Sequence, residues 1–270
     1  MCGIVGAVCN RDVFGILIEG LKRLEYRGYD SAGLSLIDAN SCLNTQKTIG
    51  RVNDLEHLFN GEIPNGGVGI AHTRWATHGV PSSANSHPHT SGSISVVHNG
   101  IIENHNLLKK ELSDRGVILS SETDSEVIAH LIDFYLPEYG SLKEAVKKTL
   151  SRLEGAYAIC VISKDYPDEM IGASSGSPLV IGLGIGENFM ASDQMALRQV
   201  TDRFIYLEEG DIAEVSKDKI SVFDDDGEIV ERDINQINES DILSEKGEYK
   251  HFMLKAVSYT HLTLPTNREV

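Results

Sequence analysis

The second half of the chain is a succession of short apolar segments at close intervals, and this pattern restricts the possible folds most. We predict strands over 156–163, 169–173, 179–183, 189–191, 203–207, 211–215, 220–223 and 228–231. Asp226-Gly227 is a typical hairpin turn between the last two strands. Many strands with short connections indicate antiparallel sheets rather than alternating strand–helix units.

The first half mixes strands with grouped helices. Strands are predicted over 3–8, 31–37, 43–49, 66–73 and 93–98, with Asn99-Gly100 as a turn after the last. A helix capped by Asp12 is expected to end at Gly28, and a short helix to cover 52–59. Capping boxes at 123–126 and 141–144 predict two further helices. The sequence thus predicts an α+β protein with helix layers against antiparallel sheets.

Composition excludes several classes of function. The 270 residues carry a formal net charge of -16, with a sequence pI of about 5.0. Such acidity argues against binding to nucleic acid, which needs clustered Lys and Arg, and against attraction to anionic membranes. The apolar start at 4–8 is followed by Arg11 and Asp12 and lacks a basic flank, so neither a signal peptide nor a membrane span is expected. The four cysteines have no metal-ligand spacing, which favours a cytoplasmic location.

Cys2 is the strongest candidate nucleophile. Removal of Met1 exposes an α-amine on a residue that also bears a thiol. An α-amine with a pKa of ~7.7–8.0 can accept a proton near neutral pH, unlike a lysine amine near ~10.4. An N-terminal amine that serves its own side chain is a recognised way to activate Ser, Thr or Cys. The alternative is that Cys2 is a small buried residue at the start of an edge strand.

Three other polar groups stand at the predicted ends of strands or at the start of a helix. Arg74 offers a planar fork of donors that suits a carboxylate, or it forms a surface ion pair. Asn99-Gly100 offers a side-chain amide and a backbone N–H that can hold an oxyanion, or it is a plain turn. Asp124 can receive a substrate ammonium, or it favours the helix dipole at the predicted helix start.

Four histidines, His72, His78, His87 and His89, lie close together in the sequence. Their spacing matches no common metal motif, so we predict no metal and expect His78 and His87 to order loops or contact substrate. Trp75, the single tryptophan, is either a buried anchor or a gate on the pocket. The glycine run at 182–186 lacks the rest of a dinucleotide or P-loop motif and is expected to be a turn.

Taken together, these residues resemble the glutaminase domain of the glutamine–fructose-6-phosphate aminotransferase (isomerising) family. The stretches that carry the resemblance are MCGIVGAV, RLEYRGYDSAG, GIAHTRWATHG, HPH, VHNGIIEN, SETDSEVIAHL, LEGAYA, SGSPLVIGLG, ASD and LEEGDIAE. They run in order from Met1 to about Lys255. CGIVG followed by HNG is shared with other class II glutamine amidotransferases, whereas RLEYRGYDSAG and TRWATHG are typical of this family.

The resemblance implies an N-terminal-nucleophile hydrolase fold of four layers, αββα, and hydrolysis of L-glutamine without a cofactor. It implies that Cys2 is the nucleophile and that Asn99 and Gly100 form the oxyanion hole. The glutamine would be held by Arg74, Thr77, His78 and Asp124, with His87 and Arg27 lining or closing the pocket. Trp75 would lie where ammonia leaves for a partner domain. A homo-oligomeric full-length protein is also implied.

The resemblance divides the chain into an amidotransferase domain (1–240), the start of a linker (241–255) and a tail (256–270) unlike the family. The 270 residues are not expected to include the sugar-phosphate isomerase domain that follows in the family, so this polypeptide by itself is expected to supply ammonia without making glucosamine 6-phosphate. Two alternatives stay open. One is the ammonia-supplying domain of another class II enzyme such as amidophosphoribosyltransferase, and the other is a catalytically silent regulatory module.

Overall fold

The computed structural model describes residues 2–59, 65–75 and 79–237. Residues up to Asn235 form one compact unit, and the unit that begins at Gln236 is described for two residues only. Thr77, His78 and Met1 lie outside the described residues, as do the segments 241–255 and 256–270. The predicted domain boundary at 240 therefore stays a prediction.

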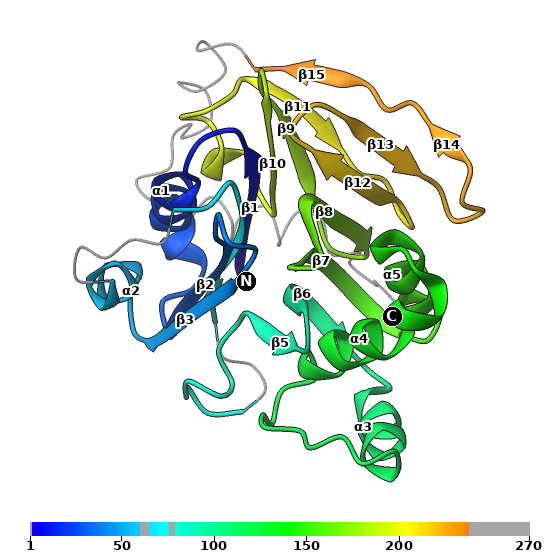
Figure 1. The fold of residues 1–270 in the computed structure, drawn as a ribbon. Helices are drawn as coiled ribbons and strands as arrows, with labels where there is room; N and C mark the ends of the chain where they lie inside the picture. The colour runs from blue at the N-terminus through cyan, green and yellow to red at the C-terminus, as the bar shows by residue number, and fades with distance from the viewer. Residues whose placement is uncertain (1, 60–64, 76–78, 238–270) are drawn as a thin grey trace, which may run out of the picture. The chain divides into compact units, whose positions relative to one another are not determined.

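Two antiparallel sheets form the centre of the compact unit (Figure 1). The first sheet has the order β15-β11-β9-β10-β1-β4-β2-β3. Its strands are β1 (Gly3–Cys9), β2 (Ser31–Ile37), β3 (Leu43–Ile49), β4 (Val68–Arg74), β9 (Val180–Leu183), β10 (Glu187–Ala191), β11 (Arg203–Tyr206) and β15 (Ile234–Gln236). The second has the order β14-β13-β12-β8-β7-β6-β5. Its strands are β5 (His89–Ser91), β6 (Ile94–Ile102), β7 (Gly155–Ser163), β8 (Tyr166–Ser175), β12 (Ile212–Ser216), β13 (Ile220–Phe223) and β14 (Ile229–Val230).

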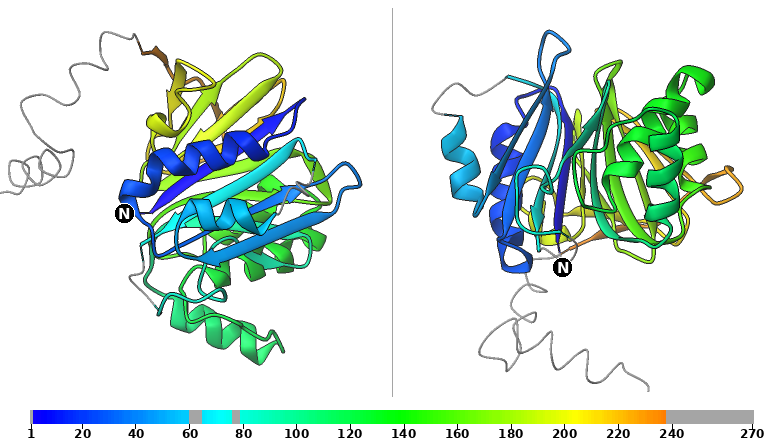
Figure 2. Two further views of the ribbon diagram at one scale, coloured as in Figure 1. Left: turned by 90° about the vertical axis from the view of Figure 1, so that its left-hand side faces the viewer. Right: turned by 90° about the horizontal axis from the view of Figure 1, so that it is seen from below.

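Helices cover the outer face of each sheet (Figure 2). The first sheet is covered by α1 (Phe14–Leu24) and α2 (Val52–Leu58), and the second by α4 (Glu126–Tyr139) and α5 (Leu142–Leu150). α3 (His105–Asp114) packs against α4. Short 3₁₀ turns lie at Glu25–Arg27 and Gln194–Ala196. The predicted αββα arrangement is confirmed.

The inner faces of the sheets share one core. Ile4 and Ile70 of the first sheet and Val97 and Ile162 of the second are fully buried there. A second core fills the space between the second sheet and α3, α4 and α5. Because apolar residues of β6 and β7 contribute to both cores, each of these strands is buried on both faces.

Asn99 and Gly100 do not form the predicted turn. They lie inside β6, where Asn99 is opposite Ala158 and Gly100 opposite Tyr157 of β7. Gly100 has a φ of 135°, and a Cβ at this position would collide with the carbonyl oxygen of Ala156. The Asn-Gly pair therefore marks a local irregularity in a long strand. Only glycine can adopt the backbone conformation and the close approach found at position 100.

The predicted capping boxes have different outcomes. α4 begins at Glu126, after Thr123, and the Glu126 carboxylate accepts backbone N–H groups of Ser120 and Ser121 instead of closing a box. At α5 the Ser141 hydroxyl accepts the N–H of Glu144, as expected for the cap. α3 was not predicted because only Leu108 and Leu112 of its ten residues are buried, which leaves a weak helical pattern.

Candidate active site

Cys2 lies directly before β1, beside the end of the neighbouring strand β4. β1 pairs with β4 so that Gly3 is opposite Thr73, which brings residue 2 next to the Arg74-Trp75 segment. The backbone N–H of Trp75 donates to Sγ of Cys2 at 3.3 Å, and the thiol lies 3.7 Å from the Trp75 carbonyl oxygen. Sheet pairing thus fixes the thiol at a strand end.

A small open pocket surrounds this thiol. Its lining residues come from both sheets and from the segment before α4: Cys2, Arg74, Trp75, His87, His98, Gly100, Thr123, Asp124 and Ser125. The pocket has an empty volume of about 310 Å³, part of it open to solvent.

The environment of Cys2 keeps the thiol protonated in the absence of a base. Burial raises the pKa of Cys2 above its usual value, and the Trp75 N–H and the positive charge of Arg74 oppose this effect only in part. Because the thiolate is the reactive form of cysteine, a proton acceptor close to Sγ is required for attack near neutral pH.

Arg74 and Asp124 supply opposite charges to the pocket. Each side chain is about 5% exposed, so both act in a poorly hydrated environment. Burial lowers the pKa of Arg74, while the nearby Cys2, Asp30 and Asp124 raise it. The Asp124 carboxylate accepts the backbone N–H of Ile102 at 2.7 Å. A guanidinium and a carboxylate in one small pocket can bind the two charged ends of an amino acid.

Asn99 lies behind the pocket, with its amide directed at the Cys2 backbone. Its Nδ2 donates to the carbonyl oxygen of Cys2 at 3.1 Å, and its Oδ1 lies 3.0 Å from Nε2 of His72. Gly100, the next residue, lines the pocket itself. The two predicted oxyanion donors are therefore adjacent to the nucleophile.

A buried histidine cluster (His72, His87, His89 and His98) packs against the site. The rings of His72 and His87 are stacked with centroids 4.2 Å apart, and His89 meets His87 edge-on at 4.7 Å. Burial lowers the pKa of His72 to about 3 and also lowers the pKa of the other three. These imidazoles are therefore neutral at physiological pH.

Trp75 is a half-exposed side chain at the pocket mouth rather than a buried anchor. Its ring meets Tyr29 edge-on, with centroids 5.8 Å apart, and the residue is 45% exposed. Arg27 does not line the pocket but forms an ion pair with Asp193 and contacts Tyr26. The placement of Thr77 and His78 is not described.

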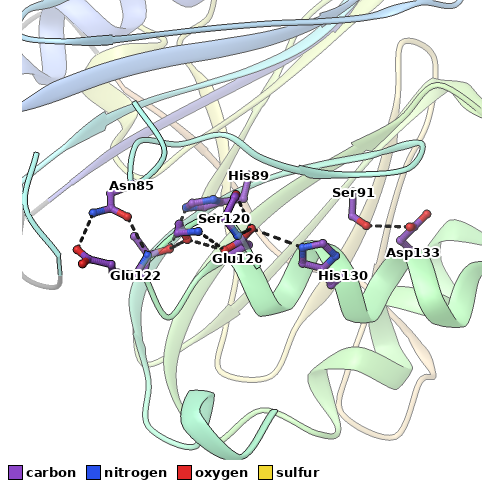
Figure 3. A network of polar contacts seen from close by, with 10 residues as sticks. Asn85, His89, Ser91, Ser120, Glu122, Glu126, His130 and Asp133 are labelled. Atoms are coloured by element: carbon purple, nitrogen blue, oxygen red, sulfur yellow. Dashed lines mark hydrogen bonds and ion pairs between the residues drawn. The ribbon is translucent and has the colours of Figure 1, made fainter. Parts of the chain in front are cut away.

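A polar network holds the segment that leads to Asp124 (Figure 3). The Glu126 carboxylate accepts the N–H and hydroxyl groups of both Ser120 and Ser121 at 2.7–2.8 Å. Burial raises the pKa of Glu126, but the His130 imidazole, 3.6 Å away, and the hydrogen bonds from Ser120 and Ser121 outweigh this effect and leave the pKa far below its usual value. The segment before α4 is thus tied to the helix that follows it.

The network also reaches the loop before β5. Asn85 bridges the Val80 carbonyl and the Glu122 carboxylate, and Nε2 of His89 lies 3.1 Å from the Thr123 hydroxyl (Figure 3). Both sides of the pocket are therefore held by side chains with defined partners.

Three pocket residues were not among the predicted site residues: His98, Thr123 and Ser125. Each is a direct sequence neighbour of Asn99 or Asp124, which is the one indication that the sequence offered. Among the described residues no group of His, Cys, Asp or Glu is arranged to hold a metal ion. No described helix is long and apolar enough to cross a membrane.

Comparison with known proteins agrees with this geometry. Residues 72–199 match the family described as a glutamine amidotransferase domain. The fold is similar to that of glutamine phosphoribosylpyrophosphate amidotransferase from B. subtilis complexed with ADP and GMP. The TM-score is 0.72 at 29% identity, over 84% of this chain and 50% of that one. A glutamine aminotransferase class-II domain protein from Silicibacter pomeroyi, at 15% identity and a TM-score of 0.55 over 83% of this chain and 99% of its own, shares the fold. The chain therefore belongs to the class II glutamine amidotransferases, which have the N-terminal-nucleophile hydrolase fold.

Within that class, the sequence is similar to two enzymes named glutamine–fructose-6-phosphate aminotransferase (isomerizing). The protein of Vibrio vulnificus is 55% identical over 257 residues, and that of Pseudomonas putida is 55% identical over 258 residues. Each comparison covers 95% of this chain and 42% of the relative. The family expected from the sequence is confirmed, and the chain spans less than half the length of these relatives.

Proposed function

We propose that this chain hydrolyses L-glutamine to glutamate and ammonia at the Cys2 pocket. One observation carries the proposal: a cysteine thiol, a buried guanidinium and a buried carboxylate line the same small pocket. This arrangement suits an amino acid whose side-chain amide reaches a nucleophile.

Substrate binding follows from the charges. Arg74 pairs with the α-carboxylate of glutamine and Asp124 with its α-ammonium. His87 lines the same pocket. Thr77, His78 and Arg27 are kept as further glutamine contacts from the family resemblance, and Trp75 as a gate at the pocket mouth.

The reaction begins after removal of Met1. The free α-amine of Cys2 takes the thiol proton, and Sγ forms a bond to the amide carbon of glutamine, with the carbonyl oxygen becoming an oxyanion held by Asn99 and Gly100. When the oxyanion re-forms the carbonyl, the C–N bond breaks and the leaving nitrogen takes the proton from the α-ammonium, which releases ammonia. Water then attacks the γ-glutamyl thioester, gives its proton through the same amine to Sγ, and releases glutamate.

The names of the similar enzymes suggest how the ammonia is used. We propose that ammonia passes to a C-terminal sugar-phosphate isomerase domain for synthesis of glucosamine 6-phosphate from fructose 6-phosphate, in a homo-oligomeric cytoplasmic protein. The segment after residue 240 would lead to that domain. The ammonia-supplying domain of another class II enzyme, such as amidophosphoribosyltransferase, is the second candidate, favoured by the structural similarity to the B. subtilis enzyme.

The test is a glutaminase assay combined with intact-mass analysis. We expect glutamate release that is lost in the Cys2→Ala variant, and one adduct of an electrophilic glutamine analogue on an N-terminal Cys2. Full activity of Cys2→Ala, or activity of chains that retain Met1, would refute this mechanism. A chain that binds glutamine without hydrolysing it would support the silent regulatory module.

A further inference from the structure

We propose that His72 is a positioning residue that orients the Asn99 amide so that its nitrogen faces the reacting carbonyl. The inference rests on the proposed glutaminase function, and it assigns a role to a buried imidazole that does not itself line the pocket.

The orientation of the Asn99 amide follows from its two partners. Nδ2 lies 3.1 Å from the carbonyl oxygen of Cys2, which can only accept a hydrogen bond. The amide nitrogen must therefore point toward Cys2, and Oδ1 must point away from it. Nδ2 carries two hydrogens, so one can bond the Cys2 carbonyl while the other serves an oxyanion.

The orientation of the Asn99 amide determines which ring nitrogen of His72 carries the hydrogen. Oδ1 of Asn99 lies 3.0 Å from Nε2 of His72 and can only accept, so Nε2 must carry the hydrogen. Nδ1 of His72 has no hydrogen-bond partner in the described part of the chain. A buried polar atom without a partner opposes folding, so an apolar residue at this position would be the more stabilising choice. Its hydrogen bond to Asn99 gives a reason for an imidazole at this position.

The ring itself has little freedom to move. His72 lies in the middle of the first sheet, where it is paired with Ile4 on one side and Gly33 on the other. Its ring stacks on His87 at an interplanar angle of 17°, and Nδ1 of His87 accepts the backbone N–H of His98 at 3.1 Å. A neutral imidazole held in this way can fix Asn99 without bringing a charge beside the nucleophile.

The role can be separated from a structural one by a double-mutant cycle on the full chain with Met1 removed. His72→Phe keeps the buried ring but removes the N–H, His72→Gln restores a donor, and Asn99→Ala removes the amide. We expect His72→Phe to lower kcat for glutamine roughly five- to tenfold, the effect of one neutral hydrogen bond, with little change in KM. His72→Gln should recover part of the loss. In the Asn99→Ala background, His72→Phe should have no further effect.

Alkylation of Cys2 by iodoacetamide supplies the control, because displacement of iodide at a saturated carbon forms no oxyanion. Its rate, followed on the Cys2 peptide by mass spectrometry, should be the same in wild type and His72→Phe. A loss of kcat that is equal in the presence and absence of the Asn99 amide, or no loss at all, would overturn the proposal.

A third measurement does not depend on activity or on variants that fold. ¹⁵N spectroscopy of the wild-type chain reports whether neutral His72 carries its proton on Nε2, as expected, or on Nδ1, which would overturn the proposal. If the wild type proves unable to hydrolyse glutamine, the proposed function fails while this test of the His72–Asn99 contact still decides the orientation.

Discussion

Oδ2 of Asp124 accepts the backbone N–H of Ile102 at a distance of 2.7 Å. This contact joins the start of α4 to the end of β6, the strand that carries Asn99 and Gly100. The carboxylate proposed to hold the substrate ammonium and the groups proposed to hold the oxyanion are thus parts of one rigid frame. A change at Asp124 can affect both binding and folding, so the substitution must be chosen to separate them.

Asp124→Asn makes that separation. The asparagine oxygen can still accept from Ile102, whereas the negative charge is lost, so we expect a raised KM for glutamine with a smaller change in kcat. Loss of a charge-assisted contact corresponds to roughly a 10- to 100-fold effect. Steady-state kinetics measure it. Asp133→Asn is the matched control, because Asp133 is on α4 but contacts Ser91 away from the pocket, and KM should not change. Unaltered KM in Asp124→Asn would remove the ammonium role.

Gly100→Ala should damage both stability and activity. Gly100 combines a φ of 135° with a backbone carbonyl in the place that a Cβ would occupy. We expect a loss of at least about 2 kcal/mol in the free energy of unfolding, measured by urea titration.

Gly116→Ala provides the comparison for Gly100→Ala. Gly116 has a φ of 87°, but no described atom lies within 4 Å of the place that a Cβ would occupy, so the substitution meets the unfavourable φ alone. A cost of about 1 kcal/mol is expected there. Equal costs at the two positions would show that the close approach to Ala156 is unimportant.

The buried histidine cluster predicts a strong pH dependence of stability. Burial lowers the pKa of all four members in the folded protein, so the unfolded chain binds more protons once the pH falls below about 6.5. Stability is therefore greatest above this pH and decreases as the pH falls, by up to about 1.4 kcal/mol per pH unit for each histidine.

Charged neighbours modify this effect without reversing it. Arg74 acts on His87 and Lys47 on His89 to lower the pKa, while Asp124 raises that of His98 and Glu126 that of His89. Urea unfolding at pH 7.5, 6.5 and 5.5 measures the slope. His72→Phe should reduce the slope of unfolding free energy against pH by the equivalent of one proton, up to about 1.4 kcal/mol per pH unit. A slope identical to that of wild type would contradict a lowered pKa of His72.

Glu126→Gln tests the network before α4. The folded-state pKa of Glu126 is depressed, so its ionised form stabilises the fold above the unfolded pKa of about 4.3, and this contribution is lost as the pH falls further. We expect Glu126→Gln to be about 1–3 kcal/mol less stable than wild type at pH 7. The difference should narrow below pH ~4.3. A difference that stays constant on acidification would show that the charge is not what stabilises the segment.

The sequence predicted most strands of the first sheet well because they alternate or run apolar between clear turn residues. The predicted ranges 31–37 and 43–49 coincide with β2 and β3. Local patterns were misleading where distant contacts compete with them. Asn99-Gly100 has the composition of a turn, but pairing with β7 keeps it in a strand. Glu126 has the spacing of a capping box, but two serines upstream occupy its carboxylate.

By itself, the sequence determined the fold class, the family and most members of the pocket, because strand periodicity, Cys2, Arg74 and Asp124 are local or motif-borne features. The tertiary structure decided how they act together. Pairing of β1 with β4 places Cys2 beside Trp75, and packing of the two sheets buries His72 against Asn99. Burial and hydrogen-bond partners across 27 or more positions set the charge and orientation of these groups, and no local pattern encodes them.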